Sequence, residues 1–289
     1  MASPLVWFIT GTSTGLGKTL VSTVLARGDL VIATARTLSD IDTVWAGNPN
    51  VRTRQLDVTS GPAAIKAVVD EAAGFWGRLD VVVNNAGAGL PGLLEEGGTE
   101  VLRRQFEINL FGPFDVLVAC LPHLRKRKSG TVVIVGSRSA WKTELVGLGQ
   151  YSASKAAVHS IAETLAAEIA PLGIRVLLVE PGAFNNGMYR NPYFTENPIS
   201  DYDTMRQTSI ARFAAVPGTE KGDRVKAMEL LADVVRGEGK AAGRPWPGRL
   251  PLGEDAERDM RIKCKRVVDG LDQWTDLISN VNLDSVQES

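Results

Sequence analysis

Metal-ligating and disulfide-forming residues are scarce in this sequence. Its 289 residues contain two cysteines and two histidines. Cys120 and Cys264 lie far apart, whereas a structural zinc site needs four ligands that usually come in close pairs. We therefore expect no metal centre and no disulfide framework. Two isolated thiols are typical of a reducing compartment, so we expect a cytoplasmic protein.

An excess of one charge and long apolar runs are also lacking. Basic residues number 32 and acidic residues 33, so the formal net charge is −1, whereas a general nucleic-acid binder needs a strong positive excess. No stretch approaches the ~18 uninterrupted apolar residues of a membrane span. The run Leu5–Ile9 is too short for a signal peptide and leads directly into a glycine-rich turn, so we interpret it as a buried strand. We expect no nucleic-acid partner and no membrane span.

Short β-branched segments alternate with longer amphipathic segments up to about Glu180. The predicted strands are Leu5–Thr10, Leu30–Thr34, Val51–Gln55, Leu79–Asn84, Gly130–Gly136 and Ile174–Glu180. The predicted helices are Gly17–Arg27, Gly61–Trp76, Thr99–Lys126 and Gln150–Leu172. Strands without polar alternation, separated by helices, indicate a parallel sheet covered on both faces. With right-handed crossovers, this is a doubly wound, Rossmann-like α/β fold in a single domain, residues 1–289.

The pattern changes after the sixth predicted strand. Residues 183–220 carry glycine, asparagine, proline and aromatic residues without periodicity, and long irregular loops in compact domains are often functional. We expect a substrate loop here; an exposed insertion without function is the alternative. The C-terminal extension, residues 222–289, contains a predicted helix over Gly222–Arg236, a short edge strand over Arg249–Leu252 and a helix over Glu254–Ser279.

A glycine-rich turn joins the first predicted strand to the first predicted helix. It has the pattern Thr-Gly-x-x-x-Gly-x-Gly, with glycines at Gly11, Gly15 and Gly17. Glycine permits positive φ angles and close approach of a pyrophosphate, and the helix N-terminus offers unpaired N–H groups to the phosphates. A P-loop requires four residues between its first glycine and its Gly-Lys ending, but five separate Gly11 from Gly17. The turn therefore favours a dinucleotide; a chance glycine turn is the alternative.

The end of the second predicted strand bears on the choice of cofactor. In dinucleotide folds this position meets the adenosine ribose, where an acid binds the hydroxyls of NAD and a basic residue accommodates the 2′-phosphate of NADP. Here Ala35 is followed by Arg36, and the first acid is Asp40. A guanidinium matches phosphate geometry, so Arg36 favours NADP(H). An arginine merely exposed at a strand end is the alternative.

A tyrosine and a lysine begin the fourth predicted helix. Tyr151 and Lys155 are four residues apart, so both project from one helix face. A phenol with its ordinary pKa of ~10 is a poor acid–base catalyst at neutral pH. A nearby ammonium favours the phenolate and lowers that pKa, which makes Tyr151 usable as a general acid or base. The same spacing occurs by chance on exposed helices, so the pair gains its meaning from the other motifs.

Together these motifs resemble the short-chain dehydrogenase/reductase family over residues 5–182. They occur in the order of that family: Thr10-Gly11 through Gly17, Asn84-Asn85-Ala86-Gly87 after the fourth strand, Asn109, Ser137, Tyr151 with Lys155, and Pro181-Gly182 after the sixth strand. Arg249–Gly253, followed by Asp255-Ala256, is similar to the closing strand and helix of members that accept lipophilic carbonyls or alcohols. The resemblance also implies a homo-oligomer, a dimer or a tetramer.

The resemblance implies a role for each matching residue. Tyr151 would exchange the substrate proton, and Ser137 would orient the substrate oxygen. Lys155 would bind the nicotinamide ribose besides tuning Tyr151, and Asn109 would support a water relay to Lys155. The implied cofactor contacts are Gly11, Thr14, Gly15, Leu16 and Gly17 at the pyrophosphate, Asp57 at the adenine, Asn84, Ala86 and Gly87 beside the central strands, and Pro181, Gly182 and Phe184 near the nicotinamide.

Two positions depart from the family pattern. The substrate-orienting serine commonly lies thirteen residues before the tyrosine, but here Ser137 lies fourteen and Ser139 twelve residues before Tyr151. We choose Ser137 because it directly follows a predicted strand; a serine that caps its own turn is the alternative. The threonine often found after Pro-Gly is absent, and Asn185 and Asn186 occupy that stretch.

These observations predict an NADP(H)-dependent oxidoreductase that interconverts a carbonyl and an alcohol on a small molecule. The residues that favour an apolar or aromatic substrate are Trp141, Phe184, Met188, Tyr189 and Tyr193; a place in the core or at an interface is the alternative for them. One alternative is a catalytically silent NADP-binding or scaffold protein on the same fold, since function does not follow from fold alone. A P-loop NTPase is a further alternative, which the glycine spacing opposes.

Overall fold

A seven-stranded, wholly parallel sheet forms the centre of the molecule. The computed structural model describes residues 3–187 and 191–281, so Met188 and Tyr189 lie outside the described residues. The strand order is β3-β2-β1-β4-β5-β6-β7. The strands are β1 (Val6–Ile9), β2 (Leu30–Ala35), β3 (Val51–Gln55), β4 (Val81–Asn84), β5 (Gly130–Val135), β6 (Ile174–Pro181) and β7 (Arg249–Leu252). The Rossmann-like prediction is confirmed, and the strand order reverses between β1 and β4.

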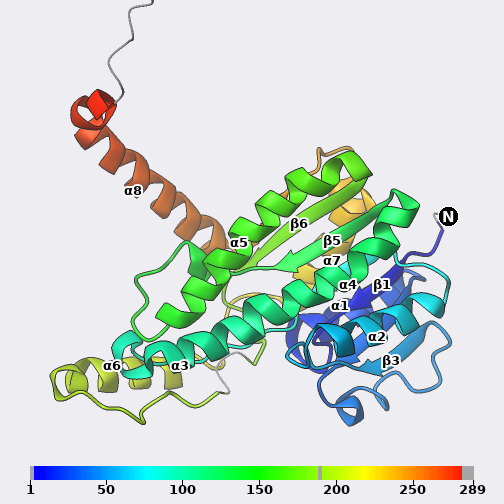
Figure 1. Ribbon diagram of the computed structural model, residues 1–289, viewed down its shortest axis with the longest axis horizontal. Coiled ribbons are helices and arrows are strands. Elements are labelled where there is room, and N and C mark those ends of the chain that lie inside the picture. The colour runs from blue at the N-terminus through cyan, green and yellow to red at the C-terminus, as the bar shows by residue number, and fades with distance from the viewer. Residues whose placement is uncertain (1–2, 188–190, 282–289) are drawn as a thin grey trace, which may run out of the picture.

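Helices cover both faces of this sheet (Figure 1). One face carries α2 (Pro62–Gly74), α4 (Gly112–Arg127) and α5 (Gly149–Ile169). The other carries α1 (Gly15–Ala26) and α7 (Arg224–Arg236). The remaining helices are α3 (Leu94–Phe106), α6 (Asp203–Ala214) and α8 (Glu254–Ile278). In Figure 1, α8 leaves the body of the molecule as a straight arm.

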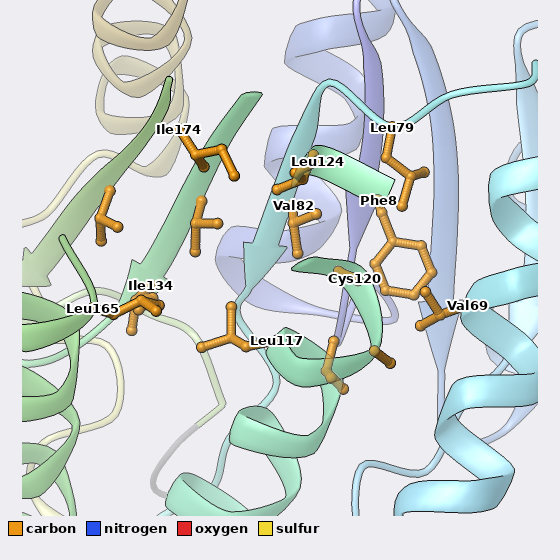
Figure 2. Packing of buried hydrophobic residues seen from close by; sticks show 14 of the residues in the cluster. Phe8, Val69, Leu79, Val82, Leu117, Cys120, Leu124, Ile134, Leu165 and Ile174 are labelled. Atoms are coloured by element: carbon orange, nitrogen blue, oxygen red, sulfur yellow. The ribbon is translucent and has the colours of Figure 1, made fainter. Parts of the chain in front are cut away.

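Burial on both faces explains why the strands read as continuous apolar runs. All four residues of β1 are completely buried. Phe8 packs in the cluster that also contains Val69 of α2 and Cys120 of α4, as Figure 2 shows, whereas Trp7 points to the opposite cluster with residues of α1 and α7. Burying a side chain of this size contributes ~1.5–3 kcal/mol, so the helices are held against the sheet by apolar contact.

The long helix predicted over Thr99–Lys126 is wrong as a single element. It consists of α3 and α4, joined by a π-helical turn over Glu107–Phe111. Pro113 has no N–H to donate to the carbonyl four residues earlier, which interrupts the α-helical ladder. At Gly112 a Cβ would overlap the carbonyl oxygen of Val58, so only glycine lets α4 approach the loop after β3.

The irregular backbone expected throughout residues 183–220 is also wrong in part. This segment contains α6, whose Arg206 binds the carboxylate of Glu96 in α3 with Nη2–Oε1 at 2.7 Å. Within α6, Ser209 is the one buried residue. The sequence of α6 has almost no apolar periodicity, so it does not predict a helix. A buried ion pair to a distant segment holds this helix in place instead.

Candidate active site

A cavity of about 580 Å³ lies at the carboxyl ends of the central strands. The crevice outside the strand ends, at a switch in strand order, is where open α/β sheets bind ligands. The predicted site residues that line the cavity are Gly11, Thr14, Leu16, Arg36, Asp57, Ala86, Gly87, Ser137, Tyr151, Lys155, Pro181, Gly182 and Phe184. Those not among the lining residues are Gly15, Gly17, Asn84 and Asn109.

The glycine turn is shaped by close approach of main chains. Gly11 has φ +69° and Gly15 has φ +58°, both in the left-handed region that favours glycine. At Gly17 a Cβ would overlap the carbonyl oxygen of Gly11. Gly15 and Gly17 therefore shape the turn without lining the cavity. They let the N-terminus of α1 face the cavity beside Thr14, and a helix N-terminus favours the binding of anions.

Charged and hydroxyl side chains line the end of the cavity next to β2 and β3. Arg36 and Asp40 follow β2, and Asp57 follows β3. The Asp57 carboxylate accepts hydrogen bonds from the backbone N–H of Thr59 at 2.9 Å and from its hydroxyl at 2.8 Å. Ser13 also lines the cavity and was not singled out from the sequence, although its place inside the glycine turn could have identified it.

Tyr151 and Lys155 are both buried on the same face of α5 and both line the cavity. The Lys155 Nζ donates to the carbonyl oxygen of Val135 at 2.8 Å and lies 6.0 Å from the centre of the Tyr151 ring. Burial lowers the pKa of Lys155 to about 8. A cation this close to the phenol favours its ionised form, as general acid–base chemistry requires.

Asn109 binds α5, the helix that carries Tyr151, through the hydroxyl of Ser154. Its Nδ2 donates to the Ser154 Oγ at 3.0 Å, and its Oδ1 accepts from the backbone N–H of Ala88 at 2.9 Å. The Ser154 hydroxyl in turn donates to the carbonyl oxygen of Tyr151 at 2.8 Å. Asn109 thus joins the π-helical turn, the loop after β4 and α5, although it does not line the cavity itself.

The two candidate serines lie together in the loop after β5. Ser137 and Ser139 both line the cavity, and the backbone N–H of Ser139 donates to the Ser137 Oγ at 3.1 Å. The backbone N–H of Ser137 donates to Nε2 of His159 at 3.2 Å. Ser137 lies two residues past Val135, the last residue of β5, whose carbonyl oxygen accepts the hydrogen bond from Lys155.

A buried polar network behind this loop was missed at the level of sequence. His159 Nδ1 lies 3.3 Å from Oε1 of Glu180. The same oxygen accepts from Trp141 Nε1 at 2.6 Å and from Arg249 Nη1 at 2.7 Å. Trp141, expected to favour an aromatic substrate, therefore belongs to this network and is not among the cavity residues. A signal was present in the spacing, since Tyr151, Lys155 and His159 repeat every four residues.

The geometry fixes the charge state of His159. Its Nε2 accepts a hydrogen bond and its Nδ1 faces a carboxylate, which requires the neutral ring protonated on Nδ1. Burial, with the positive charges of Arg249 and Lys155, lowers the pKa of His159 to about 3. Burial raises the pKa of Glu180, and its bonds to Trp141 and Arg249 oppose that rise.

Two carboxylates at the start of α8 hold the loops on either side of the cavity. Asp255 Oδ2 accepts from the backbone N–H of Ala183, just after Pro181-Gly182, at 2.8 Å. Arg138, between the two serines, donates to Asp259 Oδ2 at 2.7 Å. Sequence separations of 72 and 121 residues explain why no local motif announces these contacts.

Comparison with known proteins identifies the class. Residues 5–196 match the family model described as short chain dehydrogenase, and the chain belongs to this family of oxidoreductases. It is 32% identical to oxidoreductase BOA17 of Botryotinia fuckeliana over 94% of this chain and 97% of that protein. It is 33% identical to the NADPH-dependent 3-dehydrocapnine reductase of Ornithobacterium rhinotracheale, over 68% of this chain and 71% of that protein.

A solved structure agrees over nearly the whole chain. A short-chain dehydrogenase from Streptomyces avermitilis superposes with a TM-score of 0.84 at 33% sequence identity, covering 97% of this chain and 100% of that chain. The fold of the family binds NAD or NADP, and the cavity described above occupies the place where an open α/β sheet binds a dinucleotide. Within residues 3–187 and 191–281, no helix is both long and apolar enough to cross a membrane.

The charge state of His159 predicts a pH dependence of stability. Because its pKa in the folded protein lies below the ordinary 6.5, the unfolded chain binds more protons than the native state between about pH 6.5 and pH 3. The free energy of unfolding should therefore fall as the pH drops through this window. Urea unfolding measured at several pH values should show this fall, and the His159→Gln variant should lose that part of it.

The same histidine can be observed directly by NMR. The chain has two histidines, so the His123→Gln variant assigns the remaining imidazole signal to His159. That signal should stay at the neutral position as the pH falls from 8 to 5. Titration with a midpoint near 6.5 would contradict the neutral, hydrogen-bonded ring.

Proposed function

We propose that this protein is an NADP(H)-dependent oxidoreductase that interconverts a carbonyl and an alcohol on a small lipophilic molecule. The observation that carries the proposal is the single cavity that contains both ends of the required machinery. The glycine turn and Arg36 line one end, and Tyr151, Lys155 and Ser137 line the other. A dinucleotide cofactor must be held along such a path so that its nicotinamide meets the substrate.

The residues of the cavity fit a nicotinamide dinucleotide. The N-terminus of α1 and the main chain at Gly11 suit a pyrophosphate. Gly87 leaves room in front of Asn109 and Lys155, because a Cβ there would lie 3.1 Å from Asn109 Oδ1. When bound, the nicotinamide supplies or accepts the hydride, and the protein provides orientation and proton transfer.

Tyr151 acts as the acid in the reductive direction. Its hydroxyl gives a proton to the oxygen of the carbonyl as negative charge develops there, and Ser137 donates a hydrogen bond to the same oxygen. The Lys155 ammonium, near the Tyr151 ring, would favour the phenolate form and would bind the ribose hydroxyls of the cofactor. Asn109 and Ser154 keep the helix of the tyrosine in position through the bonds described above.

Cofactor choice follows from the side chains after β2. Arg36 lines the cavity with Ser13 and Thr37, a set of donors suited to a 2′-phosphate. The acidic side chain of Asp40 also lines this end of the cavity. The relative named as NADPH-dependent supports the same preference.

Apolar residues and asparagines together line the substrate side of the cavity. Leu145, Leu148 and the buried Phe184 line it, together with Asn186 and Asn191 from the segment 183–220. Tyr193 packs its ring on Phe213 and is not among the lining residues. We assign the segment 183–220 to substrate binding and 222–289 to a C-terminal extension of the single domain, and two isolated thiols are consistent with a cytoplasmic activity.

A turnover measurement distinguishes the proposed enzyme from a catalytically silent NADP-binding protein on the same fold. Tyr151→Phe keeps the ring and removes the hydroxyl that carries the proton. With NADPH and a panel of lipophilic ketones, turnover should fall ~10²–10⁴-fold, while NADPH still raises the melting temperature. The control is Ser22→Ala, which removes an exposed hydroxyl on α1 that binds the carbonyl oxygen of Lys18 and does not line the cavity. Wild-type turnover in Tyr151→Phe would exclude this tyrosine as the proton donor.

Arg36→Ala tests the cofactor preference. Loss of a charge-assisted contact to the 2′-phosphate should weaken NADPH binding about tenfold or more, since such hydrogen bonds contribute ~1.5–3 kcal/mol. NADH affinity should hardly change, and Lys126→Ala, which removes the same charge at the exposed end of α4, should alter neither. Calorimetry that shows NADH and NADPH equally weakened, or NADH preferred by the wild type, would contradict the assignment.

The choice between the serines is tested by comparing two alanine variants. Ser137→Ala should lower the rate of hydride transfer strongly in single-turnover experiments and leave NADPH affinity intact, because its proposed partner is the substrate oxygen. Ser139→Ala should have little effect on either quantity. A reversed order of damage would identify Ser139 as the hydroxyl that contacts the substrate.

A further inference from the structure

Only the root of α8 is packed against the body of the protein. Of its 25 residues, Ala256 and Asp259 are buried, and every residue from Val267 to Val281 is exposed. Figure 1 shows this arm pointing away from the sheet. The arm nevertheless carries large apolar side chains, including Trp274 at 58% and Leu271 at 51% exposure. Soluble monomers rarely expose contiguous apolar surface of this kind.

Most apolar residues from Met260 to Val281 form a heptad pattern, and Ile262, Val268 and Leu277 lie outside it. Alternating steps of four and three residues connect Met260, Cys264, Val267, Leu271, Trp274, Ile278 and Val281. An average spacing of 3.5 residues places such a set on one stripe of a helix and is the signature of two helices that wind around each other. The stripe therefore fits another helix of similar length.

Charge along the arm indicates what that helix is and how it runs. Residues 261–266 contain four basic and no acidic residues, whereas residues 267–281 contain three acidic and no basic residues. A parallel second copy of α8 would bring basic residues against basic and acidic against acidic. An antiparallel copy brings each basic segment against the acidic segment of the other, so the arm is complementary to itself when reversed.

The heptad pattern also gives a register for the antiparallel pair. When the two stripes interleave, Val267 faces Leu271 of the second copy, and Cys264 faces Trp274 of the second copy. In this alignment residues 261–266 run alongside residues 272–277 of the second copy, which contain Asp272 and Asp276. The register of the apolar stripe and the charge of the segments therefore agree.

We propose that the protein associates with a second copy of itself through the solvent-facing stripe of α8, with the two arms antiparallel. This surface is separate from the cavity and does not depend on the proposed function. Its root is nevertheless fixed to the cavity loops, because Asp259 and Asp255 bind Arg138 and the backbone of Ala183.

Sedimentation velocity of the full chain tests the association. The wild type should sediment as an assembly, and Leu271→Asp should yield a species of half that mass, because a carboxylate enters the apolar stripe. The matched control is Ile262→Asp, which places the same charge at an exposed position of the same helix, off the stripe. An assembly of unchanged mass in Leu271→Asp would overturn the proposal.

Disulfide trapping tests the orientation and does not require a disrupted variant. In the antiparallel register, mild copper-phenanthroline oxidation should join Trp274→Cys molecules covalently through the native Cys264, since a disulfide needs Cα atoms within about 7 Å. The wild type should not cross-link, because the two Cys264 residues lie about ten residues apart along the pair, roughly 15 Å. Thr275→Cys, adjacent but off the stripe, is the control. Cross-linking of the wild type would indicate parallel arms, and no cross-link in Trp274→Cys would refute the pairing.

A lipid surface is the competing occupant of the stripe. A wild type that sediments as a monomer and floats with phosphatidylcholine vesicles would assign the arm to a membrane and overturn self-association. The expected result is no flotation, with the assembly intact.

Discussion

The junction between the ends of β1 and β4 is the constraint on which the site depends. Asn85 Nδ2 donates to the carbonyl oxygens of Thr10 and Gly11, each at 2.9 Å. The Thr10 hydroxyl accepts from the backbone N–H groups of Asn85 and Ala86. This contact closes the turn only because Gly17 has no side chain to hold the helix away. The N-terminus of α1 can therefore face the crevice where the strand order reverses.

The second half of the site depends on one face of α5. Tyr151, Lys155 and His159 repeat every four residues and are all buried. Tyr151 lines the cavity, and Lys155 donates to the carbonyl oxygen of Val135 at the end of β5. His159 accepts the backbone N–H of Ser137 in the loop after that strand. A single rigid helix thus sets the distance between the proposed acid, its activating cation and the serine, and Glu180 completes the buried network behind them.

Much of this was predictable from local pattern. Strand runs, helical periodicity, the glycine turn and the Tyr-x-x-x-Lys spacing led to the parallel sheet and to most of the residues that line the cavity. The predicted secondary structure was wrong where contacts between distant segments, and not an apolar periodicity within one segment, stabilise an element. Helix α6 has almost no apolar face and is held by the pair of Arg206 with Glu96, and the π-helical turn at Asn109 reflects a proline and a close contact to Val58.

The sequence by itself determined the fold class, the place of the turn and the face shared by Tyr151 and Lys155, because these follow from spacing within one strand or helix. Tertiary structure alone decided which polar groups meet across the fold. His159 is neutral because it is buried near Arg249 and Lys155 and accepts the backbone N–H of Ser137, and Arg138 is fixed by an aspartate 121 residues later. Such contacts carry no local signature, since only folding of the sheet brings their segments together.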